Sequence, residues 1–166
     1  AQAAVASRKY LVQACSPITG MSAEYAEFDG SPMSRKLGWS NDRHDWFYSD
    51  SYRTAANIGL DYEWFGIDEG QCAAVDRLQE FLLEDARRNQ FHTYEINGTV
   101  AQSDVLHPVA IIATVAQGSL AANNPFTNEW IERFWNTPMR TGVRRYYDNC
   151  LYFFAFLALS GKYRIW

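Results

Sequence analysis

The sequence has no apolar run long enough to cross a bilayer. Its longest run, from Cys150 to Leu159, has ten residues, whereas a transmembrane helix needs about 20. This excludes a membrane-spanning segment and predicts a helix buried inside a folded domain. The first ten residues also lack the charged-then-apolar order of a signal peptide, so the compartment stays open between cytoplasmic and secreted.

Cysteine is scarce, and charge of either sign is dispersed. Cys15, Cys72 and Cys150 are widely spaced and form no C-x-x-C pair, which excludes a disulfide framework and gives no zinc site. The 15 Lys and Arg residues oppose 19 Asp and Glu residues, for a net charge of −4 and no basic run. This mild acidity argues against nucleic acid or an anionic membrane as a partner.

Motifs for cofactors and metals are missing as well. The sequence contains no P-loop, no G-x-G-x-x-G and no G-x-S-x-G pattern, which leaves nucleotide chemistry and serine hydrolysis without support. Asp42, His44 and Asp45 lie close together, but their spacing matches neither H-E-x-x-H nor an EF-hand loop. We therefore predict no cofactor and no metal.

The sequence does contain apolar residues that recur with a helical period. With 166 residues, 48% of them hydrophobic, the chain is long enough for one compact domain. Six helices are predicted, over residues 1–15, 51–65, 68–89, 108–122, 127–136 and 145–160. Asn97-Gly98 is a strong turn signal and predicts a short β-hairpin within 91–100. The predicted fold class is all-α with this one hairpin.

Three of these helices carry further expectations. The third is expected to start near Asp68, because Asp68 and Gln71 are spaced like a capping box. The last is apolar on nearly all sides, so it should be enclosed by protein. The first begins at Ala1 with no capping residue, which suggests a chain cut from a longer one.

A long connection precedes the second helix. Residues 16–47 are rich in Gly, Pro, Ser and Asp, and structureless loops of more than about 15 residues are uncommon inside compact domains. This segment also carries several aromatic residues, namely Tyr25, Phe28, Trp39, Trp46 and Phe47. We therefore expect an ordered loop that packs on the domain.

The second helix places polar residues in one stripe. Asp50, Thr54, Asn57 and Asp61 lie at offsets of 0, 4, 7 and 11 residues, and Arg53 flanks them. At 3.6 residues per turn they share one side of an otherwise apolar helix. Such a face either meets solvent or lines a polar cleft.

Asp50 itself allows two interpretations. It could cap the helix, since aspartate is a leading N-cap residue, with Arg53 as its ion-pair partner. It could instead be a carboxylate kept ionised by Arg53 and the helix-terminal amides, ready to orient a water molecule and take its proton.

Three segments resemble glycoside hydrolase family 8. They are residues 49–66, with the sequence SDSYRTAANIGLDYEWFG, residues 106–122, which begin with LHPV, and the loop 20–32. The resemblance is closest to the xylan-acting branch, including reducing-end xylose-releasing exo-oligoxylanases, and covers essentially the whole chain.

The resemblance implies an (α/α)6 barrel that cleaves β-1,4 linkages with inversion. It assigns Asp50 as the general base and Arg53 as its charge-stabilising neighbour. His107 matches a loop histidine that shapes the aglycone side in the exo-acting branch, although an ordinary histidine at a helix start would look the same. Trp46 and Tyr52 could stack on sugar rings, as could Trp39 and Tyr48, or could equally pack in the core. Asn57 and Asp61, in the polar stripe, complete the candidate substrate-binding set.

The chain also departs from the family pattern. An inverting glycosidase needs a second, protonated carboxyl roughly 6.5–9.5 Å from the base, and the family's acid is a glutamate in its N-terminal half. That motif is not found here, so the chain is expected to be a C-terminal half, a single domain of residues 1–166, inactive by itself. A half barrel would expose an apolar edge, which a dimer could cover.

Two alternatives remain open. The same family also acts on β-glucan and chitosan, and the backbone likeness separates these substrates from xylan poorly. The chain could also be a non-catalytic helical module that binds carbohydrate or serves as a scaffold.

Overall fold

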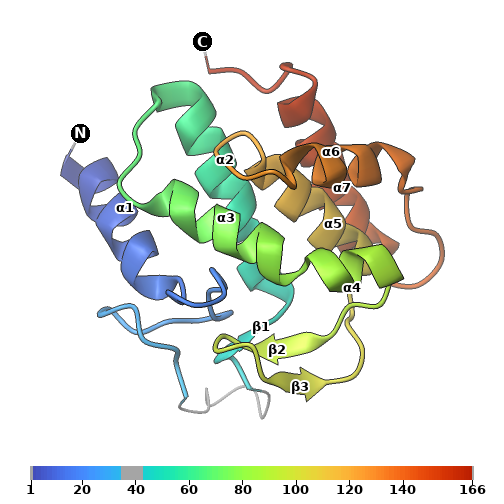
Figure 1. Ribbon diagram of the computed structural model, residues 1–166, viewed down its shortest axis with the longest axis horizontal. Coiled ribbons are helices and arrows are strands. Elements are labelled where there is room, and N and C mark those ends of the chain that lie inside the picture. Colours follow the sequence, from blue (N-terminus) through green and yellow to red (C-terminus); the bar gives the residue numbers. More distant parts are fainter. Residues whose placement is uncertain (1, 35–42, 166) are drawn as a thin grey trace.

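Helices dominate the computed structural model, which describes residues 2–34 and 43–165. Within these residues the α-helices are α1 (Gln2–Ala14), α2 (Arg53–Phe65), α3 (Gln71–Phe81), α4 (Leu83–Arg88), α5 (Pro108–Gly118), α6 (Thr127–Asn136) and α7 (Arg145–Leu159). A 3-10 turn, η1 (Ser49–Tyr52), precedes α2 directly. The strands β1 (Trp46–Phe47), β2 (Thr93–Glu95) and β3 (Val100–Gln102) form one small antiparallel sheet below the helices in Figure 1.

Helix α5 is the enclosed helix of the fold. Every residue from Ala110 to Gly118 is buried, because α5 packs on α7, α2 and α6 (Figure 1). Small residues on α5 permit these close approaches. The core around it includes the fully buried Trp130 and Phe134 of α6.

The expectation that the last helix is enclosed is wrong for this chain. Helix α7 buries one side against α5 but exposes Phe153, Phe154 and Phe156. The helix is apolar on several sides, but an apolar pattern does not determine which neighbour covers each side. A hollow of about 430 Å³ lies on this face, with Trp135 and Met139 among its lining residues. The dimer expected to cover an exposed edge stays a prediction.

Glycine allows α2 and α5 to approach closely. A Cβ at Gly59 would collide with the backbone carbonyl oxygen of Gln117, and a Cβ at Gly118 would lie 3.4 Å from the backbone carbonyl oxygen of Ala55. Because a backbone carbonyl cannot rotate out of the way, the two helices would have to separate.

We therefore expect Gly59→Ala to lower the free energy of unfolding by about 1–3 kcal/mol, the usual cost of overpacking. Urea unfolding of the variant would measure the loss. Glu63→Ala changes an exposed position on the same helix and serves as the control. A Gly59→Ala variant as stable as this control would contradict the close approach.

The predicted third helix is two helices. It breaks at Leu82 into α3 and α4. Helix α3 begins at Gln71 behind Gly70 in the left-handed conformation, without a side-chain cap, so the expected capping box is wrong. Asp68 Oδ1 instead accepts the N–H of Gly70 at 2.8 Å, which forms a local turn before the helix starts.

The predicted hairpin is present, and the sheet has one strand more. Strands β2 and β3 pair around Asn97-Gly98. Strand β1 adds to the other edge of β2, with Phe47 opposite Tyr94. Two residues are too short to show an alternating pattern, which is why β1 was not predicted. It matters for function because β1 leads straight into η1.

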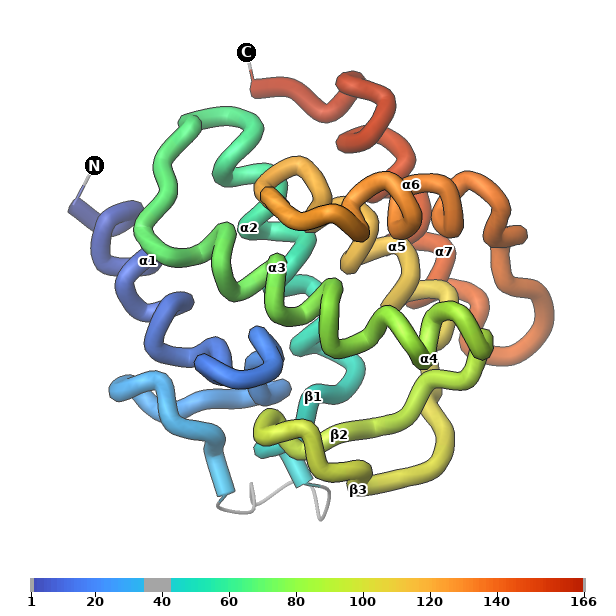
Figure 2. The backbone as a smooth tube through the Cα atoms, viewed as in Figure 1, coloured from blue at the N-terminus to red at the C-terminus, as the bar shows by residue number. Residues whose placement is uncertain are grey.

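The described part of the long connection is ordered, as expected. The segment that comes directly after α1 lies beside β1 (Figure 2), and the N–H of Glu24 donates to the carbonyl of Trp46 at 2.8 Å. Met21 is fully buried. Phe28, however, is fully exposed, so this aromatic residue does not pack as expected. Trp39 lies outside the described residues.

Among the described residues, no helix combines the length and the apolarity that a membrane-spanning helix requires.

Candidate functional site

Asp50 lies in the 3-10 turn between β1 and α2. Its carboxylate oxygen Oδ2 is 3.0 Å from Arg53 Nη2, and Arg53 Nε donates to the Asp50 carbonyl at 3.3 Å. The Asp50 side chain is 36% exposed. Ser49, just before it, has a φ of +40°, a strained conformation for a non-glycine residue that often marks functional sites.

In the part of the chain that the structure describes, Asp50 does not act as a helix cap. The N-cap residue of η1 is Tyr48 and that of α2 is Tyr52, and the turn is closed by Ser51, whose Oγ accepts the N–H of Tyr48 at 2.8 Å. The Asp50 carboxylate is therefore left to Arg53, to Tyr147 and to solvent.

Tyr147 of α7 reaches across to this carboxylate. Its hydroxyl donates to the Ser49 carbonyl at 2.9 Å and lies 3.4 Å from Asp50 Oδ1. Burial raises the pKa of the Tyr147 phenol, and the negative charge of Asp50 raises it further. The phenol therefore stays protonated at neutral pH and remains a hydrogen-bond donor beside Asp50.

His107 lies on the other side of Tyr147. The two rings are 4.5 Å apart between centroids, and His107 is buried at the start of α5. Its Nδ1 is 3.0 Å from Oδ2 of Asp148. The structure thus brings Asp50, Arg53 and His107 into one cluster through Tyr147 and Asp148.

The sequence reasoning did not find Tyr147 and Asp148. Their contacts with Asp50 and His107 join residues 97 and 41 positions apart, and no local pattern reports such distances. One signal was available, since Asp148 is the acidic residue of a largely apolar helix, and such a residue must find a partner when buried.

The predicted polar stripe does not face a single opening. Asp61 forms a two-bond ion pair with Arg8 of α1, at 2.6 and 2.7 Å, which fastens α1 to α2. Thr54 accepts a hydrogen bond from the hydroxyl of Ser22. Asn57 is exposed on α2, so the stripe divides into contacts with the rest of the domain and one solvent-facing amide.

The two aromatic candidates are differently placed. The side chain of Tyr52 is 1% exposed and packs edge-on against Phe47 in the core. Trp46 is half-buried in β1, with the Arg43 guanidinium 5.1 Å from its ring centre. Trp46 thus lies closer to solvent than Tyr52, and their roles in substrate binding stay predictions.

The residues considered for a metal make other contacts. His44 Nδ1 lies 2.6 Å from Glu24 Oε2, and Asp45 pairs with Arg43 at 2.5 Å. Asp42 is outside the described residues. The His44 contact joins the residues before β1 to the segment after α1, and the Arg43–Asp45 ion pair is local.

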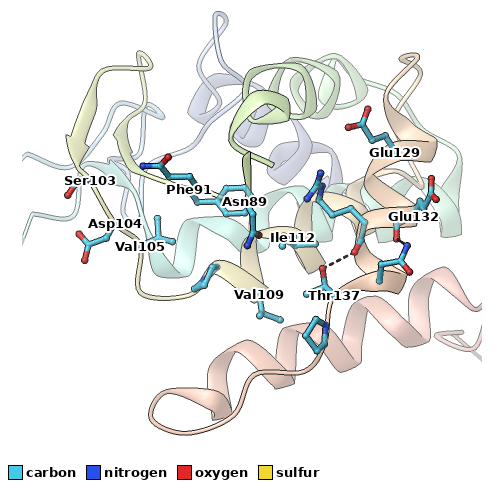
Figure 3. Close-up of a pocket in the computed structure, with 15 residues that line it drawn as sticks. Asn89, Phe91, Ser103, Asp104, Val105, Val109, Ile112, Glu129, Glu132 and Thr137 are labelled. Atoms are coloured by element: carbon cyan, nitrogen blue, oxygen red, sulfur yellow. Dashed lines mark hydrogen bonds between the residues drawn. The ribbon is translucent and has the colours of Figure 1, made fainter. Parts of the chain in front are cut away.

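An open groove of about 820 Å³ lies between the segments around Phe91 and Asp104 and helix α6 (Figure 3). Its lining includes Pro108, the residue after His107, together with Phe91 and Ile112, and on α6 Glu129 and Glu132. Neither Asp50 nor His107 is among its lining residues. The groove is therefore a neighbour of the candidate site and does not contain it.

Comparisons with known proteins identify close relatives, although no family model matches the chain. The chain is 50% identical to the reducing-end xylose-releasing exo-oligoxylanase Rex8A of Paenibacillus barcinonensis, over 99% of its own length and 42% of that protein. It is 53% identical to the reducing-end xylose-releasing exo-oligoxylanase of Bifidobacterium adolescentis, over 98% of the chain and 43% of that protein. The chain thus spans about two fifths of the length of these relatives.

The solved structures agree. The xylose complex of Rex8A from Paenibacillus barcinonensis superposes on 99% of the chain and 42% of that enzyme, with a TM-score of 0.92 and 49% identity. A crystal structure of a reducing-end xylose-releasing exo-oligoxylanase covers the same shares with a TM-score of 0.91 and 50% identity. The resemblance found in the sequence, to a C-terminal half of such a protein, is confirmed. The chain therefore belongs to glycoside hydrolase family 8, among the relatives of the reducing-end xylose-releasing exo-oligoxylanases.

Proposed function

We propose that the chain is part of an inverting glycoside hydrolase that cleaves β-1,4-xylosidic linkages in xylan or xylo-oligosaccharides, with Asp50 as its general base. The names of the relatives support the substrate class. The observation that carries the chemistry is the setting of Asp50, whose carboxylate is held by Arg53 and Tyr147, stays partly exposed and caps no helix.

The contacts of Asp50 suit a base that orients water. Arg53 holds one carboxylate oxygen, Oδ2, in an ion pair, and the Tyr147 hydroxyl lies 3.4 Å from the other, Oδ1. The remaining lone pairs face solvent, so a water molecule could bind there and lose its proton to Asp50 as it attacks the anomeric carbon. Inversion follows because the attack and the departure take place on opposite faces of the sugar ring.

In this proposal the general acid lies outside this chain, in the part of the family's enzymes that the chain does not span. Inversion needs a protonated carboxyl roughly 6.5–9.5 Å from the base, and the resemblance assigns it to a glutamate in the N-terminal half. The helices of this chain would then form half of an (α/α)6 barrel, and the 166-residue chain alone would be inactive.

His107 would determine which glycosidic bond of the xylo-oligosaccharide is cleaved. It lies beside Tyr147 and therefore one side chain away from Asp50. From there it would close the site on the reducing-end side, which restricts the leaving group to a short sugar. Xylose release from the reducing end, as printed in the names of the relatives, would follow.

Product analysis tests the substrate class. The protein that carries this chain is incubated with xylohexaose and, separately, with cellohexaose. We expect xylose to appear from xylohexaose while cellohexaose stays intact. A third incubation contains chitosan. Cleavage of cellohexaose would favour the β-glucan alternative, and cleavage of chitosan alone would favour the chitosanase alternative. Binding of xylohexaose without cleavage would favour the non-catalytic module.

A further inference from the structure

Asp148 is a fully buried carboxylate with three partners, two from the start of α5 and one from the segment before α7. Its side chain has an exposed fraction of 0%. Oδ1 accepts the N–H of Ala110 at 2.8 Å, while Oδ2 is 2.5 Å from Arg140 Nη1 and 3.0 Å from His107 Nδ1. A carboxylate is costly to bury unless every oxygen is paired. The contacts of Asp148 therefore hold the side chains and backbone of its partners in place.

The bond to Ala110 places the start of α5. Helix α5 has no side-chain cap of its own, and Pro108 occupies its first turn. Asp148 supplies the missing acceptor from α7, at the third residue of α5, where a capping oxygen normally binds. His107, the N-cap residue, has φ −135° and ψ 63°, outside the regular conformations. Its ring is therefore positioned by contacts with α7.

Arg140 fastens the residue before His107. Its Nη1 also donates to the carbonyl of Leu106. The backbone of Arg140 is held in turn by Asn149, which accepts its N–H and donates to its carbonyl, both at 2.9 Å. The Leu106-His107 turn is thus tied to α7 through two routes, one through Arg140 and one through Asp148.

The same contacts determine the tautomer of His107. An ionised carboxylate only accepts hydrogen bonds, so Oδ2 of Asp148 requires the proton to be on Nδ1. A neutral imidazole then presents Nε2 as an acceptor. We propose that Asp148 and Arg140 are positioning residues that hold the Leu106-His107 turn and fix this tautomer, so that Nε2 of His107 accepts a sugar hydroxyl at the reducing-end side. This proposal rests on the proposed function.

Asp148→Asn is the direct test, because it retains the shape but can turn an N–H toward His107. We expect the proton of His107 to move from Nδ1 to Nε2, observed by nitrogen NMR of the protein labelled with ¹⁵N-histidine. The chain has three histidines, and His107→Ala assigns the signal. For xylotriose we expect kcat/KM to fall about 10- to 100-fold, mainly through a higher KM. Asp104→Asn, which changes an exposed carboxylate near His107, is the control.

A double-mutant cycle separates positioning from a general structural role. If Asp148 acts through His107, adding Asp148→Asn to His107→Ala costs no further activity. Equal losses in both backgrounds, or an unchanged tautomer, would overturn the proposal.

Should Asp148→Asn fail to fold, Arg140→Gln leaves the bond to Ala110 intact and is expected to raise the KM for xylotriose; a normal KM would contradict it. A wild-type protein without activity on xylotriose would overturn the proposed function instead, while the NMR measurement still decides the tautomer.

Discussion

Asp50→Asn is expected to lower kcat/KM for xylo-oligosaccharides by about 10²–10⁴-fold in the protein that carries this chain, the usual contribution of a general base. The amide retains the shape of the side chain but cannot take a proton from water. Its contacts with Arg53 and Tyr147 lie in a turn that Ser51 closes independently, so the unfolding midpoint should hardly change. Steady-state kinetics and thermal unfolding of the same sample measure both quantities.

Glu63→Gln is the matched control for this variant. Glu63 is an exposed carboxylate on α2. Its replacement by glutamine removes the same charge at a distance from Tyr147. We expect normal turnover. An Asp50→Asn enzyme with near-normal turnover would remove Asp50 from the mechanism, and a strong loss of stability would point to a structural role.

Asp148→Ala is expected to cause the largest loss of stability, about 3–5 kcal/mol of unfolding free energy, as found when one partner of a buried ion pair is removed. The change leaves the N–H of Ala110 and the guanidinium of Arg140 without their shared acceptor. Urea unfolding measures the loss, and hydrogen exchange at Ala110 should become faster. Glu132→Ala, at an exposed site on α6, should change the stability by less than about 0.5 kcal/mol. A similarly small effect of Asp148→Ala would mean that α5 does not depend on this carboxylate.

Local signals predicted the local parts of the fold. The Asn97-Gly98 dipeptide alone predicts the turn, and the helical period located α6 and α7 closely. The same period could not distinguish the enclosed helix from the exposed one, because α5 and α7 are both apolar. Which of the two is surrounded depends on partners far away along the chain.

The candidate site was predictable in part for the same reason. Asp50 and Arg53 are three residues apart, so their pairing follows from the helix geometry. His107 was found only through the family resemblance, and its partner Asp148 lies 41 residues further on. The polar stripe was misleading at its far end, because Asp61 points to Arg8 of α1, a contact that the spacing along α2 does not encode.

The central claim is that Asp50 activates the attacking water, and chemical rescue tests it most directly. In the Asp50→Ala variant of the protein that carries this chain, the space left by the carboxylate can take up an added anion. With azide present, we expect turnover of a β-linked xylo-oligosaccharide to recover, and proton NMR to show an α-configured xylosyl azide, because the anion attacks from the face that water would use. No recovery with azide, or a β-configured product, would contradict the assignment of Asp50 as the base of an inverting enzyme.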